Sequence, residues 1–112
     1  MDTKELQEMA FQAVEKAKAS GKIKKGSNEV TKTIERGTAK LVLVAKDTNP
    51  KEVIMHLPAL CEEKEILFIP VSSKEELGAA AGLTVSTTAV SVTIEGEAKN
   101  IIKEIKAKLG QE

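Results

Sequence analysis

The chain has almost no aromatic residues. Two phenylalanines, Phe11 and Phe68, are present among 112 residues, and there is no tryptophan or tyrosine. Many proteins that bind single-stranded nucleic acid stack the bases on aromatic side chains. The composition therefore argues against recognition by stacking on an aromatic platform.

The chain also lacks an excess of charge of either sign. Its 17 basic and 17 acidic side chains give a formal net charge of +0 at pH 7. A protein that binds long duplexes by charge alone would be basic. Contact with nucleic acid would have to come from a local patch, and one is present at Lys22 to Lys25, Lys32 and Arg36.

Only one cysteine, Cys61, and one histidine, His56, are present. They exclude a disulfide framework and a thiolate cluster, and leave no convincing transition-metal site. The two residues are five apart on one predicted helix, hence about 140° apart around its axis, which is too far for a nucleophile–base pair. We predict no metal, no cofactor and no catalytic site. His56 is expected at the surface or its boundary, and Cys61 as a small buried hydrophobe.

No apolar run approaches the roughly 20 residues needed to span a membrane. Charged residues at Asp2, Lys4, Glu5 and Glu8 interrupt the N-terminal region where a signal peptide would lie. We therefore expect a cytoplasmic protein with no membrane partner.

Apolar periodicity predicts alternating helices and strands. The predicted helices are residues 3–19, 27–36, a segment from 49 through 61, a short segment opened by Ser73, and 97–109; the predicted strands are 22–25, 40–45, 66–71 and 89–94. This alternation favours an α/β fold, a three-layer α/β/α sandwich over one small mixed sheet of about four strands. A chain of 112 residues has room for one such core, so residues 1–112 are predicted to form a single domain.

Helix-start signals mark two of these segments. Asn49 can cap, Pro50 fits the first helical position and Glu52 can close a capping box, while Pro58 would kink or restart the same helix. Residues 73–76 form another capping box. The small residues 78–82 lack the lysine of a P-loop, so they are expected to allow close helix packing and a turn into the loop 83–88.

The stretch from Lys22 to Gly37 reads as a basic strand, a glycine hinge and a helix. Gly26 permits a sharp turn, Ser27 or Asn28 suits the N-cap, and Gly37 suits the helix stop.

Within that helix, residues 28, 32 and 36 are four apart and form a solvent-facing ridge with Glu29 beside it. The amide of Asn28 and the ammonium of Lys32 suit the acceptors of a guanine edge, and a carboxylate suits an exocyclic base amine. The alternative is a capped surface helix whose charges are only solvated, with Glu29 contacting Lys32 or Thr33.

Three segments resemble the kink-turn RNA-binding proteins of the L-seven-Ae ribosomal protein family. They are Lys25-Gly26-Ser27-Asn28-Glu29-Val30-Thr31-Lys32 continuing to Glu35-Arg36-Gly37, then His56-Leu57-Pro58-Ala59-Leu60-Cys61-Glu62-Glu63-Lys64, and Ser73-Lys74-Glu75-Glu76-Leu77-Gly78. The likeness covers nearly the whole chain in order, and the archaeal branch looks nearest. That family has the α/β/α sandwich expected above.

The resemblance implies three groups of RNA-contacting residues. The first would read the tandem sheared G·A pairs of a kink-turn and its backbone: Lys25, Gly26, Asn28, Glu29, Lys32 and Arg36. The second would cover exposed bases: Leu83, Thr84 and Val85, where Thr84 departs from the family pattern. The third would form a pocket for a bulged nucleotide: Asn49, Val53 and Lys74. Two alternatives stay open, a loop 83–85 tucked onto the core and an Asn49 that only caps a helix.

The resemblance also implies partners. In the archaeal branch one protein serves ribosomal RNA, box C/D and H/ACA guide RNAs and often ribonuclease P RNA, together with other ribonucleoprotein proteins. The chain is thus expected to be a non-catalytic RNA-binding protein, monomeric when free. Two alternatives are a protein-interaction module of the same fold and, more remotely, an accessory domain of an RNA-modifying enzyme.

Overall fold

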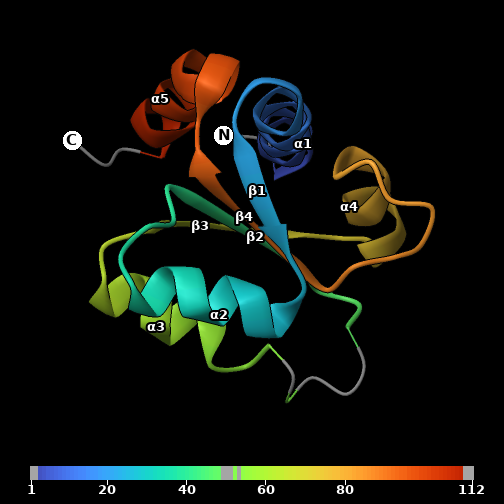
Figure 1. Ribbon diagram of the computed structural model, residues 1–112, viewed down its shortest axis with the longest axis vertical. Helices are drawn as coiled ribbons and strands as arrows, with labels where there is room; N and C mark the ends of the chain where they lie inside the picture. The colour runs from blue at the N-terminus through green and yellow to red at the C-terminus, as the bar shows by residue number, and fades with distance from the viewer. Residues whose placement is uncertain (1–2, 49–51, 53, 110–112) are drawn as a thin grey trace.

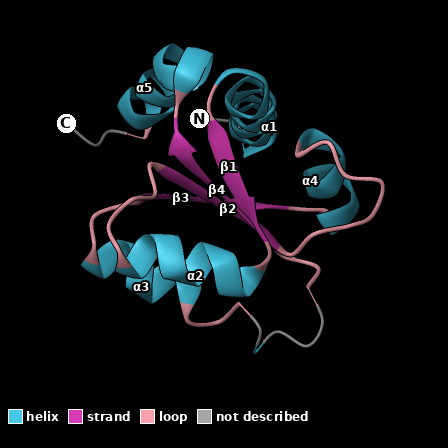
Figure 2. Cartoon of the chain, in the orientation of Figure 1, coloured by secondary structure: helices cyan, strands magenta, loops and turns pink. Residues whose placement is uncertain are grey.

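A four-stranded sheet lies between two layers of helices in the computed structural model (Figure 1, Figure 2). The structure describes residues 3–48, 52 and 54–109. One face is covered by α1 (Thr3–Ser20), α4 (Lys74–Ala80) and α5 (Lys99–Lys108), and the other by α2 (Ser27–Glu35) and α3 (Leu57–Glu63). The strands are β1 (Lys22–Lys25), β2 (Leu41–Ala45), β3 (Leu67–Val71) and β4 (Ala89–Ile94), and the 3-10 turn η2 (Gly96–Ala98) precedes α5. The predicted α/β/α sandwich with a four-stranded mixed sheet is confirmed.

The strand order is β1-β4-β2-β3. β2 and β3 are parallel, whereas β4 is antiparallel to both of its neighbours, β1 and β2. The carboxyl ends of β1, β2 and β3 and the amino end of β4 therefore meet at one edge of the sheet, called the carboxyl edge below. The segments that follow β1, β2 and β3, and the loop that precedes β4, all start or end there.

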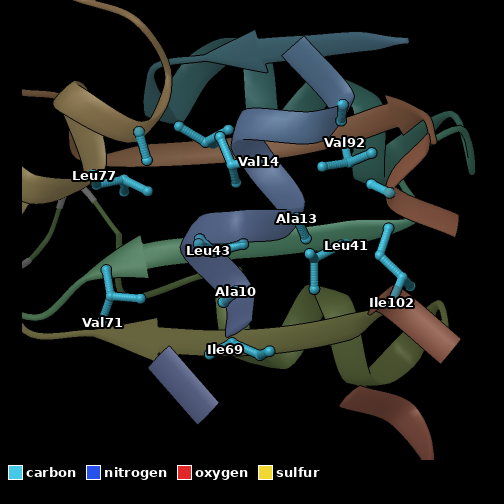
Figure 3. Packing of buried hydrophobic residues seen from close by; sticks show 14 of the residues in the cluster. Ala10, Ala13, Val14, Leu41, Leu43, Ile69, Val71, Leu77, Val92 and Ile102 are labelled. Atoms are coloured by element: carbon cyan, nitrogen blue, oxygen red, sulfur yellow. The ribbon is translucent and has the colours of Figure 1, made fainter. Parts of the chain in front are cut away.

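β2 is a central strand with all five residues buried, as its continuous apolarity predicts. Leu41, Leu43 and Ala45 belong to the core beneath α1, α4 and α5, whereas Val42 and Val44 belong to the core beneath α2 and α3. Figure 3 shows Leu41 and Leu43 beneath α1, in the core that α1, α4 and α5 cover. The alternation explains why a strand between two helix layers has no polar position.

An apolar stripe of α1 faces the sheet. Ala10, Ala13, Val14 and Ala17 are fully buried, and Leu6 packs against them at the margin. Their spacing of three and four residues places them on one side of the helix. Three of the four are alanines, so the backbone of α1 can lie close to the sheet.

The cap of α2 differs from the prediction. Gly26, and neither Ser27 nor Asn28, is the N-cap, with φ 93° and ψ 146° and no side-chain cap hydrogen bond among the described residues. The Gly26 amide donates to the carbonyl of Ala89 at 2.9 Å, and its own carbonyl accepts from Val30 at 2.9 Å. Turning directly from the ladder into the helix requires a positive φ, which serine and asparagine adopt at a cost.

The predicted end of α2 at Gly37 is confirmed. Gly37 has φ 74°, its amide donates to Ile34, and the amide of Thr38 donates to Thr33 at 2.9 Å. These two bonds form a Schellman motif, in which the left-handed residue is usually glycine.

The helix predicted from Asn49 begins later. Asn49, Pro50 and Val53 lie outside the described residues, residues 54–56 form a turn, and regular helix begins at Leu57 with Pro58 in the first turn. A proline ring clashes with the carbonyl four residues earlier in a helix, so Pro58 suits the first turn of α3, where residues 54–56 before it form a turn. His56 is consequently the N-cap of α3, so the prediction that His56 and Cys61 both lie within one helix is wrong.

The other boundaries agree closely with the sequence. β1, β4 and the loop before β4 are as predicted, β2 and β3 each begin one residue late, and the last helix is a 3-10 turn followed by α5. In α4 the Ser73 hydroxyl accepts from the amide of Glu76 at 3.2 Å, as a capping residue should. No helix in the described ranges is long and apolar enough to cross a membrane.

Candidate nucleic-acid interface

A buried polar contact fixes the rotation of α2 about its axis. The hydroxyls of Thr33 and Ser91, the latter on β4, share a hydrogen bond of 2.9 Å, and the Thr33 hydroxyl also bonds the Val30 carbonyl at 2.7 Å. Val30 and Ile34 on the same side are fully buried. Rotating the helix would break this contact and strand a buried hydroxyl, which is costly. The opposite side of α2 is thereby held toward solvent.

The exposed side of α2 carries the ridge expected from the sequence. Asn28, Glu29, Lys32 and Arg36 are all exposed. The Lys32 Nζ lies 3.4 Å from the Glu29 Oε2, and the two side chains are 54% and 52% exposed. The neighbour contact expected under the solvated-helix alternative is therefore present. Because an exposed pair of this kind contributes little stability, either group can exchange its partner for a ligand.

The ridge extends away from the carboxyl edge. At a rise of 1.5 Å per residue, Asn28 and Arg36 are about 12 Å apart along the axis of α2. Lys25 is exposed at the end of β1, just before the turn at Gly26. In Figure 1 the arrowhead of β1 points toward the start of α2. A ligand that contacts both Lys25 and Arg36 must therefore follow the length of α2.

The loop 83–85 combines the two arrangements considered from sequence. Leu83 is partly buried against the core beneath α1, α4 and α5, whereas Thr84 is exposed and Val85 is 67% exposed. The Val85 carbonyl lies directly against Gly78, where an added Cβ would collide with it. The loop thus rests on α4 through its main chain and presents one apolar side chain to solvent. The packing role expected for the small residues of α4 is confirmed.

Lys74 opens α4 at the carboxyl edge and is half-buried. Its amide donates to the Asp47 Oδ1 at 2.9 Å, and its carbonyl accepts from the amide of Thr87 at 3.2 Å. The other two residues of the implied nucleotide pocket, Asn49 and Val53, lie outside the described residues. Nothing in the sequence indicates that Asp47 has a partner 27 positions away.

Three parts of the chain meet at the carboxyl edge: the start of α2, the end of β2 and the start of α4. The turn at Gly26 is bonded to Ala89, the amide of Ala45 at the end of β2 donates to the carbonyl of Thr88 at 2.9 Å, and Lys74 is bonded to Thr87. Residues 87–89 therefore connect the starts of α2 and α4 and the end of β2. Arg36 lies at the far end of α2 and is not part of this junction.

A second contact that the sequence did not reveal joins α2 to α3. The His56 Nε2 lies 2.8 Å from the Thr31 hydroxyl oxygen, and that hydroxyl also bonds the Ser27 carbonyl at 2.7 Å. Because the Thr31 proton is directed to Ser27, the His56 Nε2 acts as the donor. His56 is exposed, as expected, and here it supports the flank of α2.

One hollow of the surface has a volume of about 820 Å³ and is lined by α3, β3, the two residues before β3 and Lys106 of α5, so it begins at the edge opposite the carboxyl edge. Residues 3–48, 52 and 54–109 contain no group of three or more His, Cys, Asp or Glu side chains that could hold a metal ion. The ridge on α2 is an exposed helix face, and none of its residues lines this hollow.

Cys61 is buried on α3, as predicted, and burial raises the pKa of its thiol from 9.0 to about 11. Because the thiolate is the reactive form, we expect its alkylation near pH 8 to be about 100-fold slower than in the unfolded chain. Iodoacetamide labelling with and without urea measures this difference in rate, and equal rates would contradict it.

The raised pKa of Cys61 also predicts a dependence of stability on pH. Its contribution to the free energy of unfolding is fully retained below pH 9 and falls between pH 9 and 11, where only the unfolded chain loses the proton.

Comparison with known proteins agrees with this architecture. A model of the family described as the ribosomal protein L7Ae/L30e/S12e/Gadd45 family matches residues 8–102, which include all four strands. A solved structure described as the Giardia lamblia 15.5kD RNA binding protein is 34% identical, with a TM-score of 0.88 over 95% of this chain and 88% of that chain. The resemblance found from the sequence is confirmed, and the chain belongs to the ribosomal protein L7Ae/L30e/S12e/Gadd45 family.

Proposed function

We propose that the chain is a non-catalytic RNA-binding protein that recognises and stabilises kink-turns. The observation that carries this proposal is the exposed set of Asn28, Glu29 and Lys32 on a helix whose rotation is fixed by Thr33 and Ser91. The family membership and the similar structure described as an RNA binding protein support it.

The three side chains have complementary roles toward bases. The amide of Asn28 and the ammonium of Lys32 donate to the O6 and N7 acceptors of guanine, and the carboxylate of Glu29 accepts from an exocyclic amine. In sheared G·A pairs these groups are turned toward the open groove. On binding, the weak Glu29–Lys32 pair of 3.4 Å would be exchanged for contacts with bases.

The shape of RNA explains why a kink is required. The major groove of a regular A-form helix is too deep and narrow for side chains to read. An RNA that is sharply bent at tandem G·A pairs admits α2. Since the protein contacts groups that align only in the bent state, binding shifts the RNA toward that state.

The surrounding residues extend this contact. We propose that Lys25 and Arg36 contact phosphates. We also propose that Gly26 allows the RNA backbone to approach, because no protein atom lies within 4 Å of the position that a side chain would occupy there. Val85 would cover an exposed base with Leu83 and Thr84 beside it. Lys74, with Asn49 and Val53, would hold the bulged nucleotide.

The wider role follows from the same reading. We propose that residues 1–112 act as one kink-turn RNA-binding domain, monomeric when free and cytoplasmic. The RNA partners proposed are ribosomal RNA, box C/D and H/ACA guide RNA, and ribonuclease P RNA. Other proteins of the particles would then dock on the protein–RNA surface, so that the chain begins ribonucleoprotein assembly.

A gel-shift titration tests this function. Two RNAs are compared at one fixed salt concentration, a kink-turn and the same RNA with both G·A pairs replaced by Watson–Crick pairs. Each well-placed base contact discriminates by about 1–3 kcal/mol, so we expect at least tenfold tighter binding to the intact kink-turn. Equal binding would indicate general charge attraction. No binding to either RNA would favour the protein-interaction module.

A further inference from the structure

The Asp47 side chain bridges two segments of the carboxyl edge that are far apart in the chain. It follows β2 and accepts, through its Oδ1, the amide of Lys74 at 2.9 Å. Lys74 is the first residue of α4, so its amide has no partner within the helix. The amide of Glu76 in the same turn is bonded by Ser73 at 3.2 Å. Asp47 and Ser73 therefore satisfy two different orphan amides of one short helix.

The main chain of Lys74 is held on both sides. Asp47 bonds its amide, and the amide of Thr87 bonds its carbonyl at 3.2 Å. Thr87 is buried, and its hydroxyl bonds the Ala89 carbonyl at 3.3 Å. The Lys74 main chain is thus fixed between the segment after β2 and the loop before β4. Both of these segments are proposed above to contact RNA.

The charge of Asp47 is unfavourable for the proposed ligand. The side chain is exposed, and an exposed carboxylate at this edge repels phosphates. An aspartate that only satisfied a turn could be replaced by a neutral residue with a gain in affinity. The hydrogen bond to Lys74 supplies a reason for an acceptor at this position, because it fixes the point from which the lysine side chain extends.

Resting on the proposed function, we propose that Asp47 is a positioning residue for the bulged nucleotide of the kink-turn. It acts through Lys74: the carboxylate holds the main chain of Lys74, so that the ammonium group at the end of this flexible side chain reaches the nucleotide. What matters in this role is the acceptor oxygen of Asp47 and not its negative charge.

The experiment separates the oxygen from the charge. Asp47→Asn keeps an acceptor at the same place and removes the charge. Asp47→Ala removes the acceptor, and Asp47→Ser leaves a hydroxyl that is too short to reach the amide of Lys74. Glu75→Ala, which removes an exposed carboxylate from the same turn of α4, is the matched control. Each protein is titrated with the kink-turn, with the same RNA lacking only the base of the bulged nucleotide, and with the RNA in which the G·A pairs are replaced.

We expect Asp47→Ala and Asp47→Ser to bind the intact kink-turn about threefold to tenfold more weakly, in line with the loss of one positioning hydrogen bond. Asp47→Asn and Glu75→Ala should bind at least as tightly as the wild-type protein. On the RNA without the bulged base, all five proteins should bind alike. In a Lys74→Ala background, Asp47→Ala should add no further loss, because the two residues act as a unit.

Amide hydrogen exchange of Lys74 in the free protein provides a readout that needs no RNA. The amide should be protected in the wild-type and Asp47→Asn proteins and exchange faster in Asp47→Ala. Unchanged affinity of Asp47→Ala, an equal loss on the RNA without the bulged base, or a loss in Asp47→Asn as large as in Asp47→Ala would each overturn the positioning role. Wild-type protein that does not distinguish the intact kink-turn from the replaced RNA would overturn the proposed function and this inference together.

Discussion

Glu29→Ala and Lys32→Ala are each expected to weaken binding to an intact kink-turn by about 10- to 100-fold, the cost of one lost base contact of about 1–3 kcal/mol. Lys22→Ala should weaken binding by no more than about threefold. Lys22 is exposed at the start of β1 and can contribute only general attraction to the RNA backbone. The contrast between a base-reading pair and a nearby surface lysine is the most direct test of the proposed interface.

The folded state should be nearly indifferent to these changes. The Glu29–Lys32 pair is about half exposed, and such pairs contribute about 0.2–1 kcal/mol. The melting temperature of each variant should therefore remain close to that of the wild-type protein. A large loss of affinity without a loss of stability would assign the effect to contact with RNA.

The measurement is a titration at several salt concentrations. Removing a phosphate-contacting lysine reduces the salt dependence of binding by about one ion, whereas removing Glu29 should leave that dependence unchanged. Glu35→Ala is a suitable control, because Glu35 is another exposed carboxylate of α2. It should bind RNA at least as tightly as the wild-type protein. Equal losses in the Glu29, Lys32 and Lys22 variants would show that general charge attraction dominates.

Gly78→Ala is expected to lower the free energy of unfolding by about 1–3 kcal/mol, the usual cost of overpacking. Helix propensity alone predicts the opposite sign, since alanine is favoured over glycine in a helix by about 1 kcal/mol. The added Cβ would collide with the Val85 carbonyl, which is main chain and cannot rotate away as a side chain would. The loop 83–85 must move as a whole, and we expect affinity for the kink-turn to fall with it.

Urea unfolding of Gly78→Ala and Ala79→Gly measures this effect. Ala79 is the exposed neighbour on the same helix, so Ala79→Gly reports propensity without a collision and should cost about 1 kcal/mol. A Gly78→Ala protein that is more stable than the wild type would mean that the loop yields at little cost. In that case the position of Val85 would not depend on its contact with α4.

Local patterns in the sequence determined most of the elements. The apolar run of β2, the stripe of Ala10, Ala13 and Val14 on α1, and the glycine at position 37 each act within a few residues. Periodicity and left-handed backbone geometry are properties of the local chain, so they can be read without knowing the fold. The same locality made the four-residue spacing of Asn28, Lys32 and Arg36 visible as one ridge.

Local signals were insufficient where a residue depends on a distant partner. The ladder bond to Ala89 places Gly26 at the cap that Ser27 and Asn28 suit by residue type. Capping preferences rank residue types at a given position, but the path of the chain decides which position is the cap.

What the sequence by itself determined is therefore the set of elements, the exposed ridge on α2 and the family to which the chain belongs. The tertiary structure alone decided which segments meet. The bond between Thr33 and Ser91 fixes the face of α2, and the bond between Asp47 and Lys74 joins the turn after β2 to the start of α4; they connect residues 58 and 27 positions apart. Such contacts have no periodic signature, because they arise only when the strands take the order β1-β4-β2-β3 and bring their ends to one edge.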